Sequence, residues 1–355
     1  MNRYVNYEFW KNKRILLTGH TGFKGSWLSL WLQSMGALVY GVALKSKNSP
    51  AMFDVANVAS GMKHHITDIR DLSALRNHIQ TFNPQIIIHM AAQPLVRKSY
   101  KEPVETFEIN VMGTVNVLEA ARSGKDLSVI VNVTTDKCYD NREWPWGYRE
   151  DDAMGGYDPY SSSKGCVELL SAAYRKSFFN KAGIAMATAR AGNVIGGGDW
   201  SKDRLIPDIF RFLEKKQPVE IRNPNAIRPW QHVLEPLSGY LILAECLYEK
   251  SGISFAEGWN FGPNDEDAKT VEWMASKICN SWSETAGWTS QIGQHPHEAN
   301  FLKLDISKSK QRLGWSPRWN LETALDCTVE WHNAWINGND MRNMSLMQIN
   351  NYNNL

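Results

Sequence analysis

The sequence predicts an α/β protein in which a doubly wound parallel sheet is followed by a smaller mixed C-terminal lobe. Strand-like and helix-like segments alternate through the first half of the chain, the pattern of right-handed crossovers between parallel strands. A glycine-rich turn, LLTGHTGFKGS over residues 16–26, joins the first strand to the first helix. Beyond about residue 195 short segments, prolines and loops replace the alternation. At 355 residues the chain can hold one large domain or two moderate ones.

The expected strands are short apolar runs, and the expected helices carry apolar residues at three- and four-residue spacing. The strands cover residues 14–19, 38–44, 64–69, 84–92, 128–135 and 186–194. The helices cover the segment after Gly25, residues 72–82, residues 104–122 and the segment after Tyr160. A late strand at 258–263 is expected to return to the sheet, so the two halves should not divide cleanly.

The glycine-rich turn predicts a dinucleotide site. Gly19, Gly22 and Gly25 directly follow a strand and directly precede a helix, where glycines let the backbone turn tightly and approach a pyrophosphate. The helix N-terminus adds oriented N–H groups and a partial positive charge. The alternative is an ordinary strand–turn–helix with packing glycines. His20 and Lys24 place two basic side chains in the same loop.

Composition excludes several classes of function. A formal net charge of +2 gives no reason to expect a nucleic-acid partner. The five cysteines include no CxxC pair, so neither a disulfide framework nor a bound metal is expected. The N-terminus lacks the apolar core of a signal peptide, and no apolar run is long enough to span a membrane. We therefore expect a cytoplasmic protein.

Several motifs occur together in a consistent order. Gly19, Gly22 and Gly25 have the spacing G-x-x-G-x-x-G. The other motifs are HMAAQ at 89–93, NVMGTVNVLEAA at 110–121, Tyr160-Ser-Ser-Ser-Lys164, and LDISKSKQRLGWSP at 304–317. From about residue 12 to 330 the chain thus resembles the extended branch of the short-chain dehydrogenase/reductase superfamily. The resemblance implies a Rossmann-type NAD-binding domain over 1–194, a sugar-nucleotide-binding lobe over 195–340 with segments returning to the first domain, and a tail over 341–355.

Tyr160 and Lys164 are four residues apart on an expected helix and share a face. A nearby ammonium lowers the pKa of a tyrosine by favouring the phenolate. The pair could then take a proton from a substrate hydroxyl while hydride leaves the same carbon. The resemblance implies that Thr135 hydrogen-bonds that hydroxyl.

Asp136 and Lys137 follow Thr135 and point to a particular reaction. The Thr-Asp-Lys of this chain resembles the cytidine-linked sugar-nucleotide 4,6-dehydratases, which act on CDP-glucose. The thymidine-linked enzymes have a sequence similar to Thr-Asp-Glu at these positions. The resemblance implies oxidation at C4, loss of the C5 proton and the C6 hydroxyl as water, and hydride return to C6, in deoxysugar (O-antigen, lipopolysaccharide) synthesis. We assign Asp136 as the acid at the C6 oxygen and Lys137 as the base at C5, each tuned by desolvation. Lys137 could instead stabilise the enolate, or both could be a solvated loop pair.

The resemblance also implies the cofactor contacts. Asp68 and Ile69 would hold the adenine, although Asp68 could instead cap the next helix. Lys45 and Lys47 stand where an acidic ribose clamp is usual and by themselves favour NADP, whereas the resemblance favours NAD, which we adopt. The full expected set is Gly19, His20, Thr21, Gly22, Phe23, Lys24, Gly25, Asp68, Ile69, Ala91, Ala92, Gln93, Asn110, Thr134, Tyr160 and Lys164.

The expected substrate contacts lie mostly in the second half. Asn193 matches a diphosphate contact, and Arg204 with Leu205 matches a segment along the nucleoside. Arg228, in a motif resembling R-x-W-x-x-V, could bind a phosphate through paired hydrogen bonds. The full expected set is Gln93, Thr135, Tyr157, Asn193, Arg204, Leu205, Arg228, His232 and Glu298.

Two questions remain open at this stage. Dimerisation through the helix at 104–122 and the helix carrying Tyr160 is implied by the resemblance, as a dimer or a dimer of dimers. Rival activities are a dTDP- or GDP-linked 4,6-dehydratase, and a sugar-nucleotide 4-epimerase or reductase, which would need neither Asp136 nor Lys137. A non-catalytic dinucleotide sensor would tend to lack the Tyr160/Lys164 pair.

Overall fold

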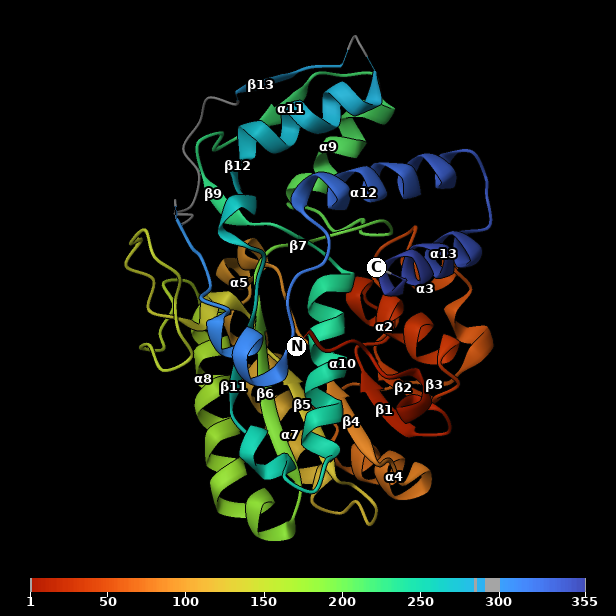
Figure 1. Ribbon diagram of the computed structural model, residues 1–355, viewed down its shortest axis with the longest axis vertical. Coiled ribbons are helices and arrows are strands. Elements are labelled where there is room, and N and C mark those ends of the chain that lie inside the picture. The colour runs from red at the N-terminus through yellow and green to blue at the C-terminus, as the bar shows by residue number, and fades with distance from the viewer. Residues whose placement is uncertain (1, 284–285, 291–300, 355) are drawn as a thin grey trace.

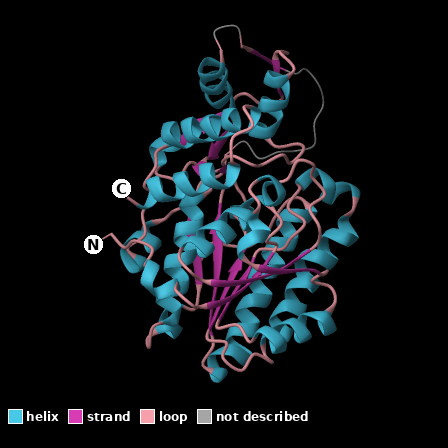
Figure 2. Ribbon diagram, turned by 90° about the vertical axis from the view of Figure 1, so that its right-hand side faces the viewer, coloured by secondary structure: helices cyan, strands magenta, loops and turns pink. Residues whose placement is uncertain are grey.

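A seven-stranded parallel sheet forms the centre of the molecule, with the strand order β11-β6-β5-β4-β1-β2-β3. The computed structural model describes residues 2–283, 286–290 and 301–354. The strands of the sheet are β1 Arg14–Thr18, β2 Leu38–Ala43, β3 Lys63–Ile66, β4 Ile86–His89, β5 Val129–Val133, β6 Ala185–Ala191 and β11 Gly258–Phe261. Helices cover both faces of the sheet (Figures 1 and 2). The order confirms the predicted doubly wound fold.

Alternating side chains of the strands pack into two separate hydrophobic cores, one on each face of the sheet. On β4, Ile86 and Ile88 join one core, which also contains Trp27 and Trp31 of α2. Ile87 points to the other face, where α4 and α7 pack. Because a buried parallel strand offers apolar residues to both faces, these strands read as continuous hydrophobic runs in the sequence.

Several helices surround the sheet. They are α1 Tyr7–Trp10, α2 Phe23–Ser34, α3 Met52–Val55, α4 Leu72–Phe82, α5 Val96–Lys101, α6 Pro103–Phe107, α7 Gly113–Ala121, α8 Pro159–Tyr174 and α10 Leu234–Tyr248. The helix expected over 104–122 is divided: a π-helical turn, Glu108–Met112, separates α6 from α7. Strand β11 confirms the prediction that a late segment returns to the sheet, where it pairs with β6.

A smaller lobe covers the carboxyl ends of the strands (Figure 1). Its helices are α9 Leu205–Glu214, α11 Val271–Trp282 and α12 Leu321–Ile336. Its paired strands are β7 Val194–Ile195 with β10 Gln231–His232, β8 Val219–Ile221 with β13 Trp288–Ser290, and β9 Ile227–Pro229 with β12 Ala268–Thr270. These elements share a core of their own around Ile209, Trp230 and Met274. We call this part the cap lobe.

The expected C-terminal tail is wrong for residues 341–353. They form α13, Met341–Asn353, which packs against α2 and α12. Asp340 caps the helix by accepting a hydrogen bond from the N–H of Asn343. Ile349 and Tyr352 are fully buried, and the Tyr352 hydroxyl donates to Glu235 at 2.8 Å. The asparagine-rich composition hid a buried face. Within the described chain, no helix is both long and apolar enough to cross a membrane.

Candidate active site

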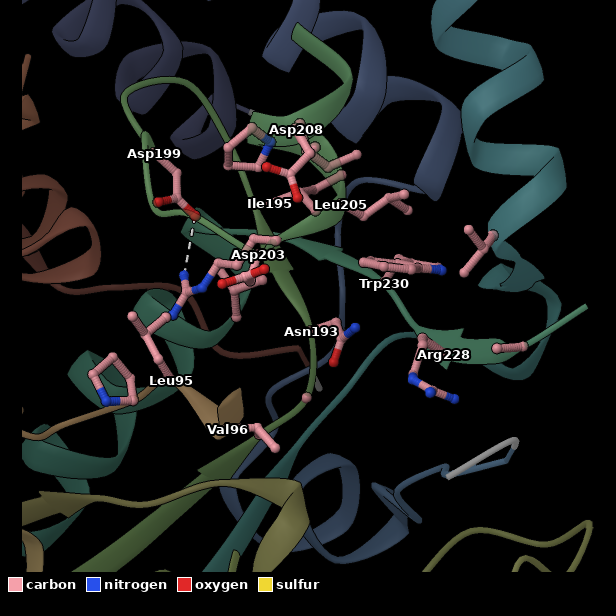
Figure 3. A pocket seen from close by; sticks show the side chains of 18 of the residues that line it. Leu95, Val96, Asn193, Ile195, Asp199, Asp203, Leu205, Asp208, Arg228 and Trp230 are labelled. Atoms are coloured by element: carbon pink, nitrogen blue, oxygen red, sulfur yellow. Dashed lines mark hydrogen bonds and ion pairs between the residues drawn. The ribbon is translucent and has the colours of Figure 1, made fainter. Parts of the chain in front are cut away.

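A pocket of about 340 Å³ lies between the ends of the parallel strands and the cap lobe. The sheet side supplies Thr135, Asp136 and Tyr160, and the cap side supplies Arg228 and Trp230. Figure 3 shows side chains from both parts converging on this space. The crevice at the carboxyl ends of the strands is where open parallel sheets bind ligands.

The glycine loop is held tightly against the end of β4. Gly19 has φ +78°, and a Cβ there would lie 2.7 Å from the amide nitrogen of Ala91. A Cβ on Gly25 would lie 2.1 Å from the carbonyl oxygen of Gly19. Gly22 caps α2 without a side-chain hydrogen bond, which leaves the first N–H groups of a twelve-residue helix for a ligand. The loop therefore fits a dinucleotide pyrophosphate. Thr21 in the loop donates to the Leu44 carbonyl at 2.7 Å.

Of the two basic residues of this loop, His20 and Lys24, His20 is uncharged. His20 is fully buried beside Phe53 and His64, and burial lowers its pKa to about 4, so the imidazole is neutral. Lys24 and Phe23 line the pocket. Burial lowers the pKa of Lys24 to about 7, and its ammonium lies 5.8 Å from the centre of the Tyr240 ring. The sequence could not show this burial.

Thr135, Asp136 and Tyr160 meet at one end of the pocket. The Thr135 hydroxyl donates to Oδ1 of Asp136 at 3.0 Å. Oδ2 of Asp136 is buried and has no hydrogen-bond partner among the described residues. Burial raises the pKa of Asp136, although the charge of Lys137 opposes the rise. An aspartic acid with this environment can retain a proton and donate it.

Lys164 is expected to lower the pKa of Tyr160, but burial has the largest effect on that pKa. Burial raises the pKa of Tyr160 to about 12, and a hydrogen bond with Thr135 opposes the rise. Lys164 donates to the Val133 carbonyl at 3.3 Å, and burial lowers its pKa to about 8. Since Lys164 is itself desolvated, its charge is costly to maintain in the protein alone.

Lys137 follows Asp136 in a short 3-10 turn, Asp136–Cys138. Its side chain is half-buried and lines the pocket, and its N–H donates to Thr135 Oγ1 at 3.4 Å. The structure thus brings the three consecutive residues to one pocket wall, and the solvated-loop alternative is wrong for Asp136, which is buried.

The two residues expected at the adenine follow β3, the edge strand of the sheet. Asp68 is held by Arg70 through ionic contacts as short as 2.7 Å, which lower the pKa of its carboxyl even though partial burial raises it. Ile69 is buried over Gly113, whose Cβ would lie 2.5 Å from the Ile69 Cδ1. The capping alternative is wrong, because Asp71, not Asp68, caps α4.

Three polar residues expected at the cofactor are engaged with the protein itself. The Gln93 amide donates to Leu95 and Thr106, and Asn110 bridges the Gln93 backbone and Ser163. Thr134 donates to the buried carboxylate of Glu168 and also lines the pocket. Ala91 and Ala92 are half-buried after β4.

The expected substrate residues divide into two groups. Asn193, Arg204, Leu205 and Arg228 line the pocket, and Arg204 donates to Asp199 at 3.0 Å (Figure 3). Gln93 is not among the pocket-lining residues.

Two residues are misplaced by the sequence reading. His232 is fully buried between Trp27 and Trp319 and does not line the pocket. Tyr157 is 81% exposed, since it precedes α8 on the outer surface, and it does not line the pocket either. Glu298 lies outside the described residues.

Sequence reasoning missed several charged residues of the pocket wall. They are Arg97, Asp199, Asp203, Asp208 and Arg222. Asp199 and Asp203 come shortly before the predicted residues Arg204 and Leu205 and could have been found by proximity. Arg222 follows a short cap-lobe strand and carries no motif signal.

The chain is similar to known proteins in sequence and in fold. The family described as GDP-mannose 4,6 dehydratase matches residues 16–328. A relative from Salmonella typhimurium named CDP-glucose 4,6-dehydratase is 57% identical over 353 residues, covering 98% of each chain. The solved dTDP-glucose 4,6-dehydratase of Bacillus anthracis in complex with NAD is similar with TM-score 0.74 at 21% identity, covering 90% of this chain and 96% of that one. UDP-glucose 4-epimerase of Thermotoga maritima with UDP-glucose gives TM-score 0.77 at 20% identity, covering 91% and 99%.

Proposed function

The chain belongs to the GDP-mannose 4,6-dehydratase family, and we propose from this membership that it dehydrates CDP-glucose to CDP-4-dehydro-6-deoxyglucose with NAD as its cofactor. The observation that carries the proposal is the buried carboxyl of Asp136, beside Tyr160 and Lys137 on one pocket wall. A 4-epimerase needs no such acid. The relative that acts on CDP-glucose by name supports the choice of cytidine.

The cofactor is assigned to the glycine loop. Gly19 and Gly25 allow the close backbone packing described above, and the uncapped start of α2 offers N–H groups to a pyrophosphate. Asp68 and Ile69 would lie at the adenine end. NAD, when bound, supplies a two-electron acceptor that takes hydride from C4 of the sugar and returns it to C6.

The acid–base work falls to the chain's own residues. Tyr160 accepts the proton of the C4 hydroxyl, which Thr135 orients, and acts as the phenolate, because a neutral phenol cannot take up that proton. Arg204 lowers the pKa of Tyr160, against the stronger effect of burial. Lys137 removes the C5 proton, which the neighbouring C4 ketone makes acidic. Asp136 donates its proton to the C6 oxygen, so that water leaves and a C5–C6 double bond forms.

Product analysis tests the proposal. The purified protein is incubated separately with CDP-glucose, dTDP-glucose and GDP-mannose, each with NAD, with NADP or with neither. We expect the alkaline ultraviolet absorbance of a 4-keto-6-deoxy sugar with CDP-glucose and NAD. A galactose nucleotide without that absorbance would show a 4-epimerase instead. Product with dTDP-glucose alone would retain the chemistry and overturn the choice of base.

We also propose a homodimer through α8 and the α6–α7 segment. Val104, Met112 and Leu169 on these elements are exposed, Leu169 at 64%. Apolar side chains gathered on neighbouring helices favour association. Sedimentation of the wild type should give twice the chain mass, and L169E should shift it toward the monomer. Monomeric wild type would reject the interface.

A further inference from the structure

Asp208 and Arg222 stand on the cap-lobe wall of the pocket, and Arg211 contacts Asp208 from outside the pocket lining. Asp208, in the first turn of α9, accepts a hydrogen bond from Arg211 one turn later. Its Oδ2 lies 3.6 Å from Nη2 of Arg222, the residue after β8. Asp208 and Arg222 both line the pocket, so the carboxylate and the guanidinium stand side by side on its wall.

The surroundings of this pair suit a planar ring. Leu205, Ile221 and Trp230 line the same pocket with apolar surface. Figure 3 shows Asp208, Leu205 and Trp230 from the cap lobe, on the other side of Asn193 from Val96. In a sugar nucleotide the diphosphate separates the reacting sugar from the base. With the sugar at Tyr160, the base therefore reaches toward the cap lobe.

The pair has hydrogen-bonding capacity left over. Nη1 of Arg222 is buried and has no hydrogen-bond partner within the described chain; it lies 3.9 Å from Oδ1 of Asp203. The carboxylate of Asp208 has more lone pairs than its two arginine partners use. The wall thus offers an acceptor next to a donor.

We propose that Asp208, positioned by Arg211 and Arg222, is the residue that selects cytosine over uracil and thymine; the inference rests on the proposed sugar-nucleotide function. Cytosine presents its N4 amino donor next to the N3 acceptor, which matches carboxylate beside guanidinium. Uracil and thymine present the O4 acceptor next to an N3–H donor. This reversed order sets O4 against the carboxylate and leaves buried polar groups unpaired.

Burial strengthens the discrimination. The side chains of Asp208 and Arg222 are 27% and 23% exposed, so water competes only in part for their hydrogen bonds. Burial also raises the pKa of Asp208, with Arg211 and Arg222 opposing the rise. In either protonation state the carboxyl retains an acceptor oxygen for the N4 amino group.

The test compares D208N with the wild type on substrates that differ in the base. Turnover is measured with CDP-glucose, UDP-glucose and dTDP-glucose, and binding of CDP and UDP by calorimetry. Because an asparagine amide can turn its NH₂ toward O4, we expect the CDP-to-UDP ratio of kcat/KM to fall at least about tenfold, within the range of one bidentate base contact. The effect should appear mainly in KM, since the reacting residues are unchanged.

A matched control removes a carboxylate outside the pocket. D151N, at an exposed position that does not line the pocket, should leave the CDP-to-UDP ratio within about twofold of the wild type. If D208N does not fold, R222Q offers a second route and should lower the same ratio.

The outcomes separate the two proposals. An unchanged ratio in a folded D208N, in both turnover and binding, would overturn the role of Asp208 while leaving the dehydratase intact. Preference of the wild type for UDP or dTDP would overturn it as well. Absence of any 4-keto-6-deoxy product would reject the proposed function, and the CDP and UDP binding measurements would still decide the role of Asp208.

Discussion

The hydroxyl of Thr135 donates a 3.0 Å hydrogen bond to Oδ1 of Asp136. The other carboxyl oxygen, Oδ2, is buried, faces no hydrogen-bond partner in the described chain, and lies where a Cβ on Gly192 would be 3.1 Å away. Thr135 thus fixes the carboxyl while its second oxygen remains available to a ligand.

Replacing Asp136 by Asn should stop dehydration after C5 deprotonation. The amide keeps the shape of the side chain but cannot donate an acidic proton to the C6 oxygen. We expect product formation to fall by about 10²–10⁴-fold, the usual contribution of a general acid. In deuterated water the C5 hydrogen should still exchange. D140N, at an exposed carboxylate in the same segment, is the control and should behave as the wild type.

Replacing Lys137 by Met should block the reaction one step earlier. Without the base, C4 oxidation should continue, seen as absorbance of reduced nicotinamide, while C5 exchange with deuterated water stops. K137R separates base from electrostatic stabiliser: recovery of most activity with Arg would favour stabilisation. K202M, at an exposed lysine, is the control. Normal yield of the 4-keto-6-deoxy product from K137M would remove Lys137 from the mechanism.

Replacing Gly19 by Ala should weaken both the fold and NAD binding. The residue has φ +78°, and its Cβ would lie 2.7 Å from the Ala91 nitrogen. Gly183 is a matched control, with φ +72° and nothing within 4 Å of its Cβ. G183A should cost only the left-handed backbone strain, about 1–2 kcal/mol. G19A should lower the melting temperature further and reduce NAD affinity; equal melting temperatures for the two variants would contradict the clash.

Replacing Glu168 by Gln should destabilise the protein by about 3–5 kcal/mol, because Arg190 would remain buried without its charged partner. The two side chains are each 5% exposed and lie 2.8 Å apart. Glu168 also accepts a 2.7 Å hydrogen bond from Thr188. Urea unfolding measures the loss. D126N breaks the partly exposed pair with Arg14 and should cost about 0–1 kcal/mol.

The Glu168–Arg190 pair also makes the stability of the protein depend on pH in the acid range. Burial raises the pKa of Glu168, but the charge of Arg190 and three hydrogen bonds outweigh it and lower the pKa in the folded protein. The pKa of a glutamate in an unfolded chain is about 4.3. The stabilisation is therefore present above that pH and declines as the pH falls through the folded-state pKa. E168Q should lose this part of the acid dependence, which unfolding curves between about pH 3 and 7 would reveal.

Much of the fold was predictable because local patterns agree with the tertiary arrangement. The apolar run at Ile86–His89 can bury its side chains only if both faces of the strand are covered. It forms a central strand of the sheet. The helix predicted at 72–82 is the observed α4, Leu72–Phe82. The C-terminal helix was missed, because its polar composition hides the burial of Ile349 and Tyr352.

The candidate site was predictable where it lies within motifs. The glycine loop, Thr135, Asp136, Lys137 and Tyr160 are close in the sequence to a strand end or a helix start. The pocket brings Thr135, Asp136, Lys137 and Tyr160 together with Phe23 and Lys24 of the loop. The prediction that His232 contacts the substrate is wrong, because its motif does not show which way a two-residue strand points its side chains. The Asp208–Arg222 pair is absent from any local pattern, since its members belong to different elements of the cap lobe.

The sequence by itself determined the order of strands and helices, the dinucleotide loop and the consecutive Thr135-Asp136-Lys137. These follow from short-range periodicity, glycine geometry and the chemistry of neighbouring side chains. Only the tertiary structure decided which ionisable groups are desolvated. Burial makes His20 neutral, keeps Asp136 disposed to hold a proton, and sets Asp208 beside Arg222. Desolvation depends on what the rest of the chain packs around a group, and that is a property of the folded molecule.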